Sequence, residues 1–173
     1  QSKRIAWDYL LEYTRALGGK ANIAELRVDF MGRRISLYGA DNPDSLRGIY
    51  LDGCVLDEIG NINPTLFTEI VRPALADRLG YCVAMGTPKG QNHFKDLRDR
   101  GYRSEGWELL EFKASETNIL DKDELLAAKA EMGEDKYQQE FECSFNAPVE
   151  GAYYSSMINT LDEQKQIIDI PKD

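Results

Sequence analysis

The chain has 173 residues and a formal net charge of −9 at pH 7, with 42% hydrophobic and 10% aromatic residues. This length allows one domain with its own core, and the composition is that of a soluble globular protein. The negative charge argues against a protein that coats nucleic acid by charge alone, so a DNA contact would need a local patch. No apolar run approaches the roughly 20 residues of a membrane span, and the polar N-terminus does not resemble a signal peptide.

The N-terminal third predicts a helix followed by a hairpin. Residues 2–17 have helical periodicity, and Gly18-Gly19 end the pattern. The apolar face of this helix would consist of Ile5, Tyr9, Leu10, Tyr13 and Leu17. Residues 22–30 and 33–38 alternate on either side of Met31-Gly32, which predicts a β-hairpin. Residues 41–48 are rich in turn formers.

The middle of the chain alternates between strand and helix patterns, as in a mostly parallel α/β sheet. Strands are predicted at residues 53–56, 81–85 and 107–112, and helices at residues 64–78 and 92–102. Asn63 and Pro64 suit the N-cap and first position of the first of these helices. Two further helices are predicted at residues 122–132 and 135–141.

Two of the predicted strands end in residues that could carry chemistry. Asp57 and Glu58 follow the first strand, and Thr87 follows the second. Working residues of open α/β sheets lie at the carboxyl ends of strands. In P-loop NTPases a strand-end Asp holds Mg²⁺ and a nearby residue positions the attacking water, while a small polar residue such as Thr87 could sense the γ-phosphate. The alternative is an acidic strand end and an ordinary loop, both facing solvent.

Three arginines are candidates for other roles. Arg47 lies in the turn-rich segment, and its permanently charged guanidinium suits an arginine finger; the alternative is a surface arginine without a partner. Arg33 and Arg34 would protrude at the hairpin turn and are candidate DNA contacts. The basic residues from Lys89 to Arg103 are interspersed with acidic ones and indicate a solvated helix face.

Cysteine, histidine and glycine usage argues against other sites. Three widely spaced cysteines, with no CxxC pair, are interpreted as small buried hydrophobic residues in a reducing compartment. A single histidine argues against zinc. Gly18-Gly19-Lys20-Ala21 resembles a phosphate loop, but Thr14 and Ala21 break the pattern and a helix precedes it, so we interpret it as a helix C-cap.

Several motifs in a fixed order resemble the large terminase subunit of tailed bacteriophages. They are residues 72–80, the run Gly-Thr-Pro-Lys-Gly-Gln-Asn-His-Phe at 86–94, Leu56-Asp57-Glu58, and residues 42–48, 137–141 and 151–154. The resemblance extends over residues 1–160. It implies a P-loop NTPase core of the ASCE, RecA-like class, with a mostly parallel sheet flanked by helices, a small helical lid and no Walker A segment. The missing Met at the start indicates an excised segment.

The resemblance also implies a division of the chain and roles for its residues. Residues 1–149 would be a partial ATPase domain with its lid at residues 116–146, and residues 150–173 would lead toward an absent nuclease domain. Asp57 would hold Mg²⁺ through water and Glu58 would be the catalytic glutamate. Thr87 would lie in the coupling motif, and Arg47 would act as a finger in trans.

The family forms a homo-oligomeric ring that packages viral DNA into procapsids in the cytoplasm of the bacterial host. ATP and Mg²⁺ are therefore the expected cofactors of the complete protein. Double-stranded DNA, the portal protein and the small terminase subunit are its expected partners, without a membrane. The chain alone is expected to bind no cofactor tightly and to hydrolyse ATP poorly. The alternatives are a degenerate prophage remnant with a non-catalytic or interaction role and a fragment of a helicase-like ATPase.

Overall fold

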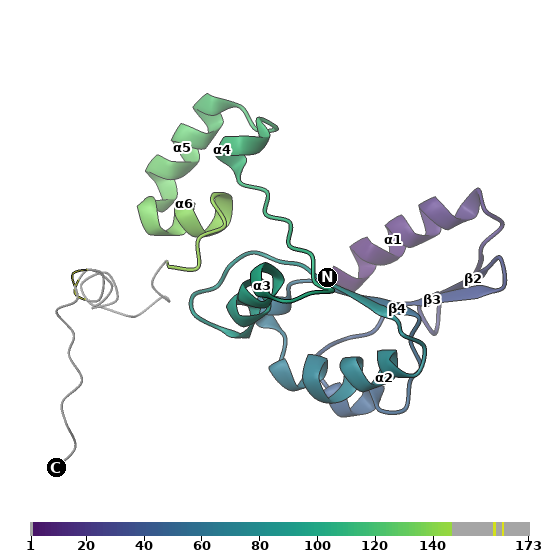
Figure 1. Cartoon of the computed structure of the whole chain (residues 1–173). Coiled ribbons are helices and arrows are strands. Elements are labelled where there is room, and N and C mark those ends of the chain that lie inside the picture. The colour runs from purple at the N-terminus through teal and green to yellow at the C-terminus, as the bar shows by residue number, and fades with distance from the viewer. Residues whose placement is uncertain (1, 147–160, 162–163, 165–173) are drawn as a thin grey trace, which may run out of the picture. The chain divides into compact units, whose positions relative to one another are not determined.

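The computed structural model describes residues 2–146, 161 and 164, and the chain divides into two compact units (Figure 1). Unit 1 comprises Gln1–Asp52 and Ile62–Gly80, and unit 2 comprises Gly53–Asn61 and Tyr81–Asp173. Most of the segment expected to lead toward a nuclease, and all of the motif at residues 151–154, lie outside the described residues. None of the helices in the described part combines the length and apolar character needed to span a membrane.

Unit 1 begins with a helix and a three-stranded antiparallel sheet. Helix α1 (Ser2–Arg15) contacts the central strand of a sheet with the order β1-β2-β3. The strands are β1 (Lys20–Asn22), β2 (Arg27–Phe30) and β3 (Arg33–Ser36). The hairpin of β2 and β3 confirms the predicted turn at Met31-Gly32, with Val28 opposite Ile35, but residues 23–26 of the predicted first strand form a turn instead. Strand β1 was not predicted because it has only three residues, and two of them, Lys20 and Ala21, were interpreted as part of a helix C-cap.

Helix α1 buries a different face from the one that its apolar periodicity predicts. Trp7 and Thr14 are the residues of this helix that are almost fully buried, with 7% and 5% exposed. The predicted apolar face is exposed instead at Ile5, Tyr9, Tyr13 and Leu17. A Cβ on Gly19 would lie 2.9 Å from both Thr14 and Val28, so glycine lets the chain pass closely between α1 and β2.

The second half of unit 1 contains a short 3₁₀ helix, η1 (Pro43–Leu46), and a longer helix that departs from α geometry. The stretch η3 (Leu66–Val71) has π-helical geometry and continues into α2 (Arg72–Ala76). Pro73 has no amide proton for an α-helical bond, and Arg72 donates its N–H five residues back to Phe67 O. The predicted apolar side is buried, at Leu66, Phe67, Ile70, Val71 and Leu75.

Unit 2 contains a parallel pair of strands. Strands β4 (Gly53–Leu56) and β5 (Tyr81–Ala84) pair in register from Gly53 opposite Tyr81 to Leu56 opposite Ala84. The third predicted strand is wrong, because residues 107–112 form no strand and their Leu110 and Phe112 side chains are largely exposed. A mostly parallel sheet is therefore not confirmed: the described strands form one parallel pair and one antiparallel triplet.

The remaining elements of unit 2 are helical. A 3₁₀ turn, η2 (Ile59–Asn61), follows β4, and helix α3 (His93–Arg103) follows β5 close to its predicted position. Helices α4 (Ala114–Thr117), α5 (Lys122–Met132) and α6 (Glu134–Phe141) lie together in Figure 1, and α5 contacts α6. Asp121 caps α5 by accepting from Asp123 N, which confirms the predicted start of that helix.

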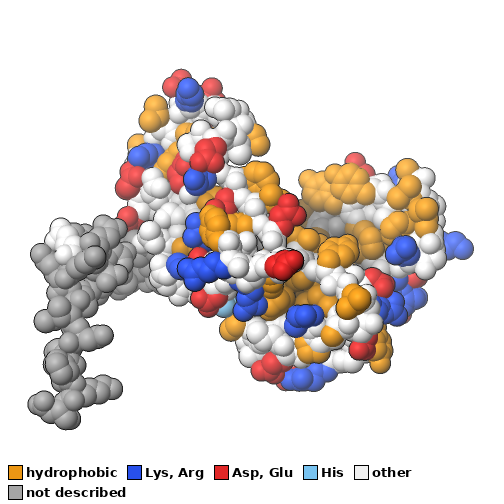
Figure 2. All heavy atoms as spheres, viewed as in Figure 1, with side chains coloured by type: hydrophobic (Ala, Val, Ile, Leu, Met, Phe, Trp, Pro, Cys, Tyr) orange, Lys and Arg blue, Asp and Glu red, His pale blue; other side chains and the backbone are white. Residues whose placement is uncertain are grey.

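Apolar side chains reach the surface of both units, and Figure 2 shows them as patches on the viewed face. On one face of the β4–β5 pair, Val55, Tyr81 and Val83 are 60%, 68% and 45% exposed. The other face carries Cys54 and Cys82, which are half-buried rather than fully buried as predicted. Parallel sheets are normally covered on both faces, so this pair exposes more apolar surface than a complete α/β core does.

Candidate functional site

The parallel pairing of β4 and β5 places Asp57, Glu58 and Thr87 at the same edge of the strand pair. Backbone pairing continues beyond the strands, because Met85 N donates to Leu56 O and Ile59 N donates to Met85 O, each at 3.0 Å. The turn after β4 is thereby joined to the chain that leaves β5. The strand-end rule applied to the sequence finds this edge correctly.

Glu58 occupies a strained backbone position. Its φ is +53°, in the left-handed region that non-glycine residues seldom adopt. Its N–H donates to Asp57 Oδ1 at 3.1 Å, so the first carboxylate helps to hold the turn that presents the second. Strained backbone of this kind persists where surrounding structure enforces it, and it is concentrated at functional sites.

Gly86 allows the chain after β5 to pass directly against the Glu58 backbone. A Cβ at this position would lie 3.2 Å from Glu58 Cα and 3.3 Å from Ile59 N, which is closer than ordinary packing allows. Thr87 follows immediately, and its backbone oxygen lies 3.5 Å from the position that a Cβ on Gly60 would take. The segment that begins with Gly86 and Thr87 therefore packs closely against the turn that contains Glu58.

A chain of polar side chains connects Glu58 to the segment after β5. Asn61 Nδ2 donates to Glu58 Oε2 at 3.4 Å, and Lys89 Nζ donates to Asn61 Oδ1 at 2.7 Å. Asn61 was not singled out from the sequence, and Lys89 was interpreted as part of a solvated face. The signal that could have found Lys89 is its place in the run at 86–94.

Asn92 and His93 anchor the same segment, defined as the 86–92 loop, and the start of α3. Asn92 Nδ2 donates to Gly60 O at 3.2 Å, while its Oδ1 accepts from Phe94 N and caps α3. His93 Nε2 lies 2.8 Å from Ile59 O. Because a carbonyl oxygen only accepts, Nε2 carries a proton in this arrangement. Both residues thus bind backbone oxygens of η2.

The 86–92 loop also contacts the segment that follows α6. Gln91 Nε2 lies 3.4 Å from Phe145 O and 3.4 Å from Asn146 Oδ1, and it donates to both. Phe145 is 6% exposed, and its ring packs edge-on against Phe94 of α3 at 5.4 Å. One short loop therefore contacts the turn that holds Glu58 and the chain leaving the helices α4 to α6.

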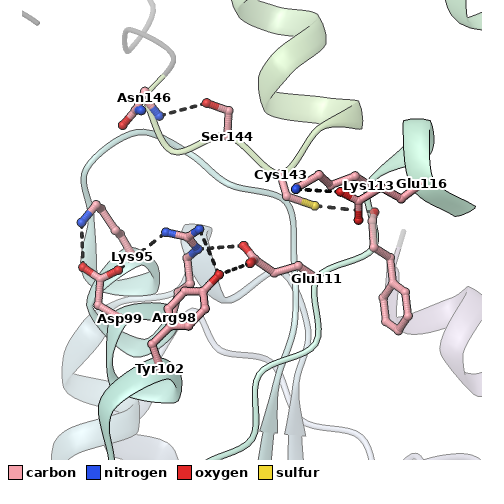
Figure 3. Close-up of polar contacts among 11 residues, drawn as sticks. Lys95, Arg98, Asp99, Tyr102, Glu111, Lys113, Glu116, Cys143, Ser144 and Asn146 are labelled. Carbon is pink, nitrogen blue, oxygen red and sulfur yellow. Dashed lines mark hydrogen bonds and ion pairs between the residues drawn. The ribbon is translucent and has the colours of Figure 1, made fainter.

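A second polar network lies between α3 and the chain that leads to α4. In Figure 3, Arg98 and Tyr102 of α3 both point toward Glu111, and Arg98 Nε donates to Glu111 Oε1 at 2.8 Å. Burial alone would raise the pKa of Glu111, but hydrogen bonds from Arg98 and Tyr102 outweigh it and lower that pKa. The same contact raises the pKa of Tyr102. This network holds residues 107–113 against α3 without a strand.

Arg47 belongs to unit 1 and has two carboxylate partners. Its Nε donates to Asp44 Oδ1 at 2.8 Å and its Nη2 donates to Glu69 Oε2 at 3.3 Å, with the side chain 56% exposed. The hydrogen bond to Asp44 raises the pKa of Arg47. The alternative of a surface arginine without a partner is wrong. Exposed pairs of this kind stabilise a fold by at most about 1 kcal/mol, so they would hold Arg47 only weakly.

The candidate DNA contacts lie on β3, after the hairpin turn. Arg33 is exposed, as expected for a residue that protrudes. Arg34 Nε donates to Asp29 Oδ1 at 2.9 Å, and this hydrogen bond raises the pKa of Arg34. Arg34 shares this acidic neighbour on β2 with Arg27, whose Nε lies 3.3 Å from Asp29 Oδ2.

The edge where β4 and β5 end carries the carboxylates of Asp57 and Glu58, and the prediction that Asp57 holds Mg²⁺ applies to this edge. Both residues are exposed at the strand edge. Within the described part of the chain, no three His, Cys, Asp or Glu side chains are grouped to hold a metal by themselves. Mg²⁺ is commonly bound by one or two carboxylates together with water and substrate phosphates, which is the arrangement that this edge could support.

Comparison with known proteins identifies similar phage proteins. The large terminase subunits of Thermus phage G20c and Thermus virus P23-45 are each 41% identical to the chain over 64 residues. The match covers 37% of this chain and 13% of each relative, so it represents a small part of their length. No protein-family model matches the chain.

Solved structures of two large terminases have a similar fold. The ATPase domain of the large terminase of Thermus phage P74-26 matches with a TM-score of 0.70 at 21% identity, over 83% of this chain and 72% of that one. The large terminase of a second thermophilic bacteriophage, in complex with ADP, matches with a TM-score of 0.62 at 17% identity, over 79% of this chain and 35% of that one. The fold thus resembles that of terminase ATPase domains, and the resemblance to large terminase subunits is confirmed over part of the chain.

Proposed function

We propose that the chain is part of the ATP-driven motor of a DNA-packaging terminase and carries its Walker B and coupling motifs. The observation that carries this proposal is the close approach of Gly86 to Glu58, 3.2 Å from a Cβ position to Cα, at the edge where β4 and β5 both end. Because the two backbones are so close, a shift of the residue whose carboxylate activates water would also move the loop. The similarity to terminase ATPase domains supports the same conclusion.

The two carboxylates take different roles in this proposal. Asp57 would hold Mg²⁺ through a bound water, and the ion would supply positive charge to offset that of the nucleotide phosphates. The carboxylate oxygens of Glu58 accept hydrogen bonds, so this side chain orients the attacking water and takes up its proton. The contact from Asn61 leaves further lone pairs on the Glu58 carboxylate for this water.

Thr87 and the 86–92 loop couple hydrolysis to movement. The loop is bound to η2 on one side, through Lys89, Asn92 and the neighbouring His93, and to residues 145–146 on the other, through Gln91. A change at Glu58 would therefore reach the end of the helical group α4 to α6. We assign residues 116–146, which contain the end of α4 together with α5 and α6, as the lid of a partial ATPase domain at residues 1–149, and residues 150–173 as the start of the link toward a nuclease domain.

The proposal also includes parts of the motor that make none of the contacts described above. Arg47 acts in trans as an arginine finger after exchanging its weak pairs with Asp44 and Glu69 for the phosphates of a neighbouring subunit. A phosphate loop outside the 173 residues supplies the cradle for ATP. The complete protein forms a homo-oligomeric ring in the bacterial cytoplasm, with double-stranded DNA, the portal protein and the small terminase subunit as partners.

The proposal is tested by ATP hydrolysis in the polypeptide that joins these 173 residues to their phosphate loop. Glu58→Gln keeps the size of the side chain but removes the base, so the rate should fall by about 100-fold or more. Glu105→Gln, at an exposed position after α3, makes the same chemical change and should leave the rate unchanged. Equal rates for Glu58→Gln and the unaltered protein would refute the assignment of Glu58.

The 173-residue chain alone should show no magnesium-dependent ATP turnover, because its sequence contains no complete phosphate-loop pattern that would cradle the β- and γ-phosphates. Steady hydrolysis by this chain that is abolished by Glu58→Gln would contradict the need for a separate phosphate loop. Hydrolysis that is insensitive to Glu58→Gln would indicate a contaminating ATPase.

A further inference from the structure

Two cysteines lie directly opposite each other on the strands that lead to the candidate site. Cys54 of β4 and Cys82 of β5 are partners in the parallel register, and their Sγ atoms are 3.5 Å apart. They are separated by 28 residues in the sequence, so only the pairing of these two strands brings them together. Nothing in the proposed ATPase chemistry uses either thiol.

Both thiols lie on the same face of the strand pair and remain partly accessible. Side chains alternate between the faces of a strand, so Cys54 and Cys82 are on the face opposite Val55 and Val83. Both cysteines are half-buried, whereas an inert structural cysteine is usually enclosed. A small oxidant can therefore reach the pair without the strands separating.

The geometry allows a bond between the two sulfur atoms. Neighbouring strands are about 4.8 Å apart, which lies within the range of Cα separations that disulfides span. The sulfur atoms must approach from 3.5 Å to about 2.05 Å, a shift that small side-chain rotations can supply. Cys143, the third cysteine, instead places its Sγ 3.6 Å from Phe112 O.

We propose that Cys54 and Cys82 form a site of reversible thiol oxidation, in which a small-molecule disulfide converts the pair to an intramolecular disulfide that joins β4 to β5. This modification lies beyond the proposed ATPase function and does not depend on it. The bond would fix the register of the two strands whose ends carry Asp57, Glu58 and Thr87.

The reaction proceeds by two exchanges. The Cys54 thiolate attacks one sulfur of the oxidant RSSR, forming a Cys54–SR mixed disulfide and releasing RS⁻. Cys82 then loses its proton and attacks Cys54 Sγ, which forms the Cys54–Cys82 bond and releases a second RS⁻. Two protons from the protein thiols convert the products to two RSH, so the pair is oxidised by two electrons and RSSR is reduced by two.

The hydrogen bond between the two sulfur atoms gives each thiol its role. It lowers the pKa of Cys54, because the proton on Cys82 stabilises a thiolate beside it. The same hydrogen bond raises the pKa of Cys82, which therefore keeps its proton until the second exchange. These directions favour Cys54 as the attacking thiol and Cys82 as the resolving thiol.

The test is disulfide mapping of the 173-residue chain after incubation with oxidised glutathione. Free thiols are blocked by alkylation, and the digest is analysed by mass spectrometry with and without reduction. The expected product is one cross-linked peptide pair that contains Cys54 and Cys82, with Cys143 still alkylated, and dithiothreitol should reverse it. Alkylated Cys54 and Cys82, separate glutathione adducts on each, or a disulfide between two chains would each overturn the proposal.

Two comparisons separate the folded pair from general thiol reactivity. Cys143→Ser should leave the cross-link unchanged, whereas Cys82→Ser should stop the reaction at a glutathione adduct on Cys54. In denaturant the ratio of cross-link to mixed disulfide should fall by about tenfold or more, because strand pairing no longer holds the thiols together. An equal ratio in folded and denatured chains would show that the strand register does not create the site.

Discussion

The backbone of Gly86 lies so close to that of Glu58 that a Cβ at position 86 would be 3.2 Å from Glu58 Cα. Glu58 itself has a φ of +53°, a conformation that its surroundings must enforce. The two backbone segments therefore cannot easily separate. The first residue of the Gly-Thr-Pro run is therefore required to be glycine for steric reasons. This requirement is independent of the role of the threonine. This relationship gives a prediction that concerns stability alone.

Gly86→Ala should lower the free energy of unfolding of the chain by about 1–3 kcal/mol, because the added methyl group has no room beside Glu58 Cα and Ile59 N. Urea unfolding followed by circular dichroism measures the change. Gly60→Ala is the matched control, since its Cβ would make an ordinary 3.5 Å contact with Thr87 O. An unchanged midpoint for Gly86→Ala would show that the two backbones can separate without cost.

Asn61 is hydrogen-bonded to both Glu58 and Lys89. Removing its side chain should therefore let the carboxylate of Glu58, the proposed base, adopt more orientations. In the ATPase-competent polypeptide, Asn61→Ala should lower kcat by about tenfold with little change in KM, because Glu58 would be less well oriented in the transition state. Asn61→Asp keeps an acceptor for Lys89 but loses the donor to Glu58, so it should be at least as impaired. Full activity of Asn61→Asp would mean that the bond to Glu58 has no part in orienting it.

The elements that the sequence predicted well are those with strong local signals. Strand β4 begins and ends where predicted, and α5 starts at the residue after its Asp121 cap. Residues 107–112 are as apolar as a strand, but a strand needs a neighbour, and here Glu111 is bound to α3 instead. The buried face of α1 was wrong for a similar reason: periodicity identifies a helix, whereas the sheet against which it packs decides which face is buried.

In the candidate site too, residues with a local sequence signal could be predicted and the others could not. Asp57, Glu58 and Thr87 could be found because strand ends and a recognisable run of residues mark them. The residues that support them could not: Asn61 binds Glu58 from only three positions away but carries no recognisable pattern, and the other contacts join residues far apart in the sequence. Lys89 and Asn61 are 28 positions apart, and His93 and Ile59 are 34 apart. Two of the contacts are made to backbone oxygens. Every residue has such an oxygen, so the sequence does not mark the accepting position.

Arg47→Ala should separate the role of a finger from that of a structural residue. In the assembled ring, ATP hydrolysis should fall by about 100-fold or more while nucleotide affinity changes little, because a finger acts on transition-state charge in a neighbouring subunit. Steady-state hydrolysis and nucleotide titration measure the two effects.

Arg78→Ala is the control for this substitution, since Arg78 is another exposed arginine of unit 1 with a carboxylate partner, Asp52. Its loss should leave both measurements unchanged. Loss of nucleotide binding in Arg47→Ala would instead assign Arg47 to the nucleotide site or to the fold, through its pairs with Asp44 and Glu69.

Glu111 should make the stability of the chain depend on pH in the acid range. Arg98 and Tyr102 hold its pKa below the ordinary value of 4.5, so the folded state favours the carboxylate. The resulting stabilisation is fully present above pH 4.5 and is lost as the pH falls through the lower pKa of the folded state. At pH 7, Glu111→Gln should therefore lower the free energy of unfolding, by about 1 kcal/mol.

This difference between Glu111→Gln and the unaltered chain should shrink as the pH is lowered from 4.5, because protonation removes the same negative charge. Urea unfolding at a series of pH values measures it, with Glu105→Gln as a control for the loss of one exposed carboxylate. A difference that stays constant down to the acid limit would mean that Glu111 contributes through packing alone. Its shrinkage would show that the ionised carboxylate of Glu111, bound by Arg98 and Tyr102, stabilises the fold.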